Sequence, residues 1–155
     1  LSRVGGVEYT EEERQFATTL RNALPPNAPP VEDAANIRPM VVNERGGGGS
    51  TDVADVSWAV ATGGMRSATW VPGTSAHSWQ AVAAGGTSIG NKGMVVAAKT
   101  LAMTAVDLFT NEALVESAKT EHQNRLPENW VYEPLLGDRS PPLDYRLPAG
   151  PAAVD

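Results

Sequence analysis

Apolar residues at helical spacing predict a helix near the start of the chain, over residues 10–24. Its stripe is formed by residues four positions apart, Phe16, Leu20 and Leu24. Thr10, with Glu13 three residues later, forms a capping-box pattern at the start of this helix. Pro25 ends it because proline cannot continue the hydrogen-bond ladder.

A longer helix is predicted over 91–109, where abundant alanines favour helix formation and close packing. Its apolar positions share one face: Met94, Ala98, Leu101, Ala105 and Leu108. Asn111 is predicted to cap a further helix that runs to Asn124.

Short apolar stretches between these helices predict strands over 37–43 and 67–71. The stretch 53–60 is either a strand or a short helix, and its periodicity does not decide. The order helix, strand, strand, long helix favours an α/β class, a partial α/β/α sandwich. A sheet needs several strands to bury two helices, so we expect this segment to belong to a larger domain.

The composition is that of a soluble globular protein, with 41% hydrophobic and 19% charged residues in a chain of 155. A net charge of −6 without a lysine-arginine cluster argues against nucleic-acid binding. No apolar run approaches the roughly 18 residues of a membrane span. The absence of cysteine excludes disulfides and thiolate metal sites, and the cytoplasm is the default location. We expect a main segment over 1–125 and an extended proline-rich tail over 126–155.

A glycine loop over 46–49 is followed by Ser50, Thr51 and Asp52. Such a loop lets the backbone approach a ligand closely, although the glycines alone are more typical of a flexible linker. Thr51 and Asp52 run directly into an apolar segment, which favours the functional interpretation. Asp52 and Asp55 would share one face of a helix and could hold a metal or divide acid and base roles. Such aspartates more often cap a turn or face solvent.

His77 is one of two histidines and follows a proline-glycine turn. A loop histidine among small residues is well placed to present a ring nitrogen to a metal, although a hydrogen-bonded structural histidine is more common. His122 lies on a polar helix and is interpreted as a surface residue. The tryptophans near these loops line either an aromatic pocket or the core: Trp58, Trp70 and Trp79.

The sequence Gly86-Thr87-Ser88-Ile89-Gly90 matches the nucleophile elbow of serine hydrolases. Asp107 and His122 follow Ser88 in the expected order, but both fall on the helices directly after it. We therefore favour a turn in which Ser88 caps the following helix.

The chain resembles the C-terminal part of a family of zinc metallopeptidases and amidohydrolases, in its aminobenzoyl-glutamate utilization protein B branch. The relatives in this family include aminoacylases and glutamate carboxypeptidase. The resemblance covers about residues 5–125 and is carried by the opening segment 9–17 and four motifs, 49–58, 70–74, 76–80 and 87–90.

The resemblance implies an α/β sandwich with two zinc ions, a second domain for dimerisation, and a metal-activated water that attacks an amide carbonyl. It implies that His77 is the last metal-ligand histidine. It places Gly49, Ser50, Thr51 and Asp52 in a loop beside the site. The family's earlier ligands and catalytic glutamate have no match here, and Asn91 stands where a histidine is expected.

We therefore expect a cytoplasmic, metal-dependent hydrolase of N-acyl amino acid amides such as an aroyl-glutamate. This chain would supply only the C-terminal part of the site. Its partners would be the small-molecule amide, the missing N-terminal part of the catalytic domain and a second copy of the full protein. We expect no activity from the chain alone, because one histidine is too few for a zinc site. The alternative is a non-catalytic fragment or subunit that packs against a partner chain.

Overall fold

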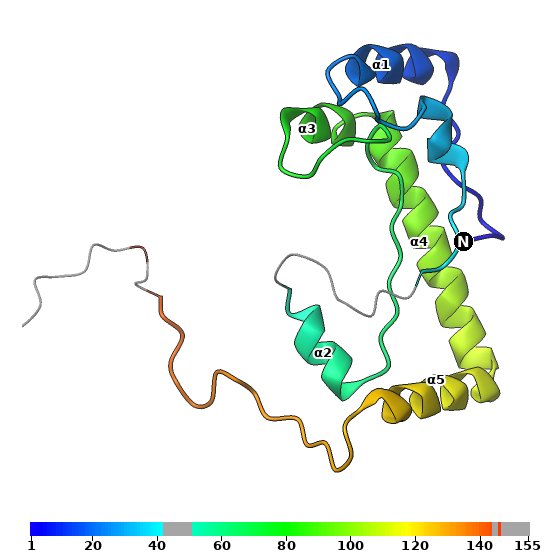
Figure 1. Cartoon of the computed structure of the whole chain (residues 1–155). Coiled ribbons are helices and arrows are strands. Elements are labelled where there is room, and N and C mark those ends of the chain that lie inside the picture. Colours follow the sequence, from blue (N-terminus) through cyan, green and yellow to red (C-terminus); the bar gives the residue numbers. More distant parts are fainter. Residues whose placement is uncertain (42–50, 144–145, 147–155) are drawn as a thin grey trace, which may run out of the picture.

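The structure is a computed structural model, and it describes residues 1–41, 51–143 and 146. All regular elements in these ranges are helical (Figure 1). They are α1 (Glu11–Arg21), a 3-10 helix (Val31–Ala35), α2 (Val53–Ala59), α3 (Trp79–Gly85), α4 (Ser88–Thr110) and α5 (Glu112–Arg125). α1 and α3 gather at one end of the long helix α4, and α2 and α5 lie at its other end.

The predicted α/β sandwich is wrong for the described residues, which contain no β-strand. Residues 37–41 and 67–71 have no regular structure, and 42–43 lie outside the described part of the chain. A strand needs a neighbouring strand to pair its backbone groups, and none of the described segments provides one. The undecided stretch 53–60 forms the short helix α2.

The capping box predicted for the first helix is confirmed. The Thr10 side chain accepts a hydrogen bond from the Glu13 backbone N–H at 3.3 Å, and the Glu13 carboxylate accepts one from the Thr10 N–H at 2.7 Å. α1 ends at Arg21, earlier than predicted, and the Arg21 guanidinium donates to the carbonyls of Ala28 and Pro29 in the following loop. The cap and these bonds fix both ends of the helix.

Helix α4 begins three residues before its predicted start, at Ser88. Its cap is Thr87 rather than Ser88, because the Thr87 hydroxyl accepts from the Ile89 N–H at 3.3 Å. A Cβ atom on Gly93 would lie 2.6 Å from the Ala68 carbonyl oxygen. The absence of this atom lets the segment 67–70 lie directly against α4.

The core is small and sits where α1, α3 and the first turns of α4 meet. Its two largest fully buried side chains are Ile89 and Val71. The other members of the cluster are Val7, Tyr9, Ala17, Leu20, Val31, Ala34 and Ala84. This end of the molecule carries the loop that contains His77, so the core supports the candidate site.

The apolar face predicted for the long helix is exposed rather than packed. Met94 is 59% exposed, Leu101 60% and Leu108 41%. The buried residues of α4 are Ile89, Gly90, Gly93 and Thr100, most of them in its first turns. None of the described residues covers this face, and exposed apolar faces often mark interaction surfaces.

By length and composition, α4 is also able to cross a membrane, contrary to the expectation that no segment reaches this size. An 18-residue window in it has a mean hydropathy of 1.3, and 11% of that window is buried. Core helices meet the same criterion when their apolar face packs on protein.

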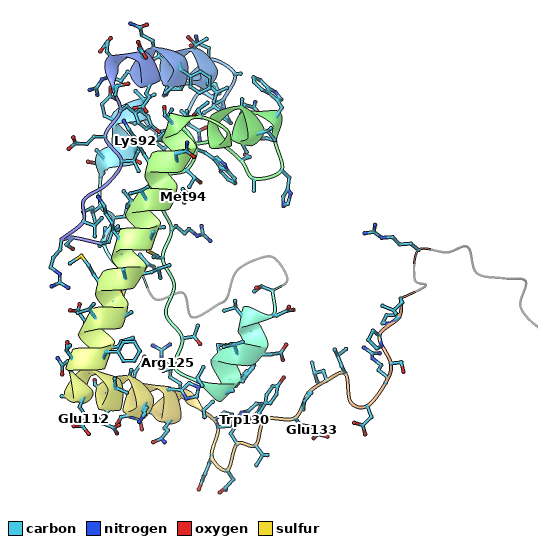
Figure 2. The ribbon with its side chains drawn as sticks, turned by 180° about the vertical axis from the view of Figure 1, so that it is seen from behind. Lys92, Met94, Glu112, Arg125, Trp130 and Glu133 are labelled. Atoms are coloured by element: carbon cyan, nitrogen blue, oxygen red, sulfur yellow. The ribbon has the colours of Figure 1, made fainter. Side chains whose placement is uncertain are left out.

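Helix α2 contacts the segment around the end of α5. The Trp58 and Trp130 rings stack with centroids 4.4 Å apart. A His122 ring nitrogen lies 3.0 Å from the Ser57 carbonyl oxygen. Figure 2 shows Trp130 beside α2, just beyond the end of α5. Asn111 caps α5 as predicted, by accepting from the Leu114 N–H at 3.2 Å.

Candidate functional site

The candidate metal ligand His77 lies in a tightly held loop before α3. Its backbone has a φ of 58°, in the left-handed region that few non-glycine residues adopt. The Ser78 hydroxyl accepts from the Ala81 N–H at 3.2 Å and donates to the Ser75 carbonyl at 2.7 Å. Gly73, with a φ of 90°, lies so close to Ala28 that an added Cβ would be 2.6 Å from the Ala28 Cβ. The loop is therefore fixed at both ends, with local strain at the histidine.

A pocket of about 440 Å³ opens beside this loop. Its lining consists of Trp70, His77, Ser78, Trp79, Ala81 and Val82. The Trp70 ring lies against the end of α3, since a Cβ atom on Gly85 would be 3.4 Å from Trp70 Nε1. Of the three tryptophans considered from the sequence, Trp70 and Trp79 share the pocket, and Trp58 stacks elsewhere on Trp130.

The glycine loop before α2 is only partly described, since Gly49 and Ser50 lie outside the described residues. Thr51 accepts a hydrogen bond from the Val53 N–H at 3.3 Å, and Asp52 directly precedes α2 without a side-chain capping bond. Among the described residues, no hydrogen bond or ion pair joins Asp52 to His77. Whether the loops that contain Asp52 and His77 lie beside one site therefore stays a prediction.

Asp55 has a structural partner on the segment that follows α5. The Tyr132 hydroxyl donates to Asp55 Oδ1 at 3.0 Å. This hydrogen bond, with smaller contributions from desolvation and the nearby charge, raises the pKa of Tyr132. The resemblance assigned no role to Asp55, and this contact ties it to the packing of α2.

The described residues do not make a metal centre. No group of three or more histidine, cysteine, aspartate or glutamate side chains gathers within residues 1–41 and 51–143. His77 contributes one ligand at most, and a zinc site takes about four. The residues present therefore do not by themselves fit the two-zinc site that the resemblance implies.

A charged cluster that could not be foreseen from the sequence joins α1 to α4. Glu13 Oε1 accepts from the Ser88 hydroxyl at 2.6 Å, and Glu13 Oε2 accepts from Lys92 Nζ at 2.5 Å. Lys92 also donates to the Glu8 carbonyl at 2.9 Å. Figure 2 shows Lys92 at the end of α4 that lies beside α1.

The Glu13 side chain is only 8% exposed. Burial alone would raise the pKa of Glu13. The hydrogen bonds from Lys92, Ser88 and the Thr10 backbone, together with the Lys92 charge, outweigh it and lower the pKa from 4.5 to about 2. Burial, followed by the neighbouring Glu13 charge, raises the pKa of Tyr9 to about 12. The cluster holds an ionised carboxylate at the core and is structural.

The serine-hydrolase alternative finds no support in this geometry. Ser88 donates to Glu13, Asp107 pairs with Arg3 at 2.7 Å, and His122 contacts the Ser57 carbonyl. A catalytic serine needs its base within hydrogen-bond reach. The three side chains have separate partners, so they form no triad.

A search of curated proteins finds similarity to one subunit of the p-aminobenzoyl-glutamate hydrolase of Escherichia coli (strain K12). The two sequences are 41% identical over 90 residues, which is 58% of this chain and 19% of that protein. This similarity supports the family resemblance, although the chain spans only about a fifth of the relative's length. No family model matches the chain. No solved structure matches it either.

Proposed function

We propose that this chain forms part of a hydrolase that cleaves the amide bond of an N-aroyl amino acid such as p-aminobenzoyl-glutamate. The observation that carries the proposal is the 41% identity over 90 residues to a subunit of a hydrolase with that name. An identity of this size over 90 residues would be expected if this part of the chain serves the same reaction.

We propose His77 as one ligand of a divalent metal, with zinc as the metal. The fixed loop and the left-handed backbone at His77 support this role, because strain of this kind is often retained where a side chain must be aimed. Gly49, Ser50, Thr51 and Asp52 are proposed as a wall of the same site. The remaining ligands and the general base would come from the rest of the hydrolase, so the chain alone would be inactive.

The exposed face of α4 supports the need for that remainder. A face that exposes Met94, Leu101 and Leu108 to water is costly, at about 25 cal/mol for each Å² of apolar surface left exposed. The partner we propose is the remainder of the hydrolase's catalytic domain. A homodimer of the complete protein and a cytoplasmic location are proposed with it.

The second candidate function is that of a non-catalytic subunit that only packs against a partner. The same exposed face favours it, because it calls for a partner whether or not the partner is catalytic. As part of the hydrolase site, the chain would need the loops at His77 and Asp52 for hydrolysis. As a non-catalytic subunit, it would not.

A chimera tests the proposal directly. The segment of the Escherichia coli protein that matches would be replaced by the matching 90 residues of this chain, and the purified product would be assayed for release of p-aminobenzoate. The proposed function predicts hydrolysis well above that of the parent protein with the segment deleted. A chimera that is folded like the parent but inactive would favour the non-catalytic subunit.

A further inference from the structure

We propose that the pocket beside His77 is the binding site for the aromatic ring of the substrate. The inference rests on the proposed function and adds to it the end of the substrate that this chain recognises. The ligand class is the aryl group of an N-aroyl amino acid. The pocket would make this chain the part of the hydrolase that distinguishes aroyl from short alkanoyl amides.

The lining of the pocket suits a flat apolar group. Two indole rings, Trp70 and Trp79, contribute to it together with Ala81 and Val82. The hollow has a volume of about 440 Å³ and is shallow and open to solvent, so a ring would lie on its surface. Trp79 is 62% exposed, more than any of the other three tryptophans. An aryl ring stacked on the indole would cover this surface, and aromatic pairs are stabilised by such offset stacking.

The charges of the lining favour the aryl end of the substrate over the glutamate end. Among the described residues, the lining contains no lysine or arginine, and His77 is its only titratable side chain. The Ser78 hydroxyl already donates to Ser75 and accepts from Ala81. The two carboxylates of a glutamate would therefore be desolvated here without a lysine or arginine to pair with. An aryl ring carries no charge and needs no such partner.

The position of the pocket fits the chemistry of the proposed substrate. In an N-aroyl amino acid the scissile carbonyl is bonded directly to the ring. A ring held in the pocket would therefore keep that carbonyl close to the hollow that His77 also lines. Trp79 would act on the specificity of the reaction and not on its chemical step.

Binding to the full 155-residue chain can be followed by NMR, since the chain has four tryptophans and so four indole N–H signals. The probe is N-benzoylglycine, with N-acetylglycine as the ring-free control. We expect saturable shifts of the Trp70 and Trp79 signals with the benzoyl compound alone, while the signals of Trp58 and Trp130 stay in place. Equal shifts of all four signals, or none, would overturn the proposal.

Two variants and one kinetic measurement separate this inference from the proposed function. Trp79→Ala should weaken benzoylglycine binding about tenfold, and Trp79→Phe should restore most of it. In the active chimera, Trp79→Ala should raise KM for p-aminobenzoyl-glutamate and leave that for acetyl-glutamate unchanged. If the chimera is active but Trp79→Ala leaves both KM values unchanged, the aryl pocket is refuted and the proposed hydrolysis stands. If the chimera binds benzoylglycine but is inactive, the proposed hydrolysis is refuted and the aryl pocket stands.

Discussion

Removing the charge of Glu13 should destabilise the end of the molecule that carries His77. In Glu13→Gln the side chain keeps its size and one acceptor oxygen, but it no longer carries a negative charge. One of its two present oxygens accepts from Ser88 at 2.6 Å, and the other from Lys92 at 2.5 Å and the Thr10 N–H at 2.7 Å. The amide nitrogen of the variant must then face one of these donors.

The structure sets the expected size of this effect. Hydrogen bonds to charged groups contribute about 1.5–3 kcal/mol each, and the Lys92 side chain is 37% exposed, so solvent screens its share. The lowering of the Glu13 pKa from 4.5 to about 2 corresponds by linkage to about 3 kcal/mol at neutral pH. We therefore expect Glu13→Gln to lower the free energy of unfolding by about 2–3 kcal/mol.

Urea unfolding followed by circular dichroism measures this loss, with Glu11→Gln as the matched control. Glu11 also lies in the first turn of α1, but its side chain is 78% exposed and its pair with Arg14 spans 3.8 Å. The control should therefore change stability by less than about 0.5 kcal/mol. Equal stability of the two variants would refute the structural role of the Glu13 cluster.

The lowered pKa of Glu13 also predicts that the free energy of unfolding depends on pH. Because the pKa of Glu13 is lower in the folded protein than in the unfolded one, its stabilisation is fully present above about pH 4.5. It should be lost as the pH falls toward 2. Glu13→Gln should flatten this part of the stability curve, and an unchanged acid dependence in the variant would assign the effect to other carboxylates.

Three further changes test the packing around the site. Gly93→Ala should cost about 2–4 kcal/mol in urea unfolding because the new Cβ would lie 2.6 Å from a backbone oxygen, whereas Gly86→Ala, with 3.7 Å to its nearest neighbour, should cost less than about 1 kcal/mol. At His77, where φ is 58°, the glycine variant should be about 1 kcal/mol more stable than the alanine variant, and the reverse order would show that the loop is not strained there. Trp130→Ala should abolish the 4.4 Å stack on Trp58 and increase amide exchange in α2 only, so unchanged exchange there would show that α2 is held by other contacts.

Local signals in the sequence predicted two of the helix caps correctly. The caps at Thr10 and Asn111 involve hydrogen bonds to residues three positions away, so the sequence contains both partners of each bond. The long helix was found from its apolar period, although its start was placed three residues late. The short helix α3 was missed because it follows the His77 loop too closely to show a period of its own.

Features that depend on distant partners could not be read from the sequence. The strand predicted at 67–71 lacks a neighbouring strand among the described residues, and the segment instead lies against Gly93. Glu13 was predicted only as a cap, since its bond to Lys92 joins residues 79 positions apart. The predicted apolar face of α4 is exposed among the described residues, because its burial depends on what else is present to cover it. The role of His77 rests on family resemblance and similarity for the same reason.

The most direct test of the proposed role of His77 uses the chimera with two histidine variants, His77→Ala and His122→Ala. Release of p-aminobenzoate and bound zinc per chain would be measured for each, with circular dichroism to confirm that both fold. We predict that His77→Ala loses zinc and lowers hydrolysis by about a hundredfold or more, while His122→Ala keeps both. A folded His77→Ala chimera with full zinc content and full hydrolysis would contradict this role.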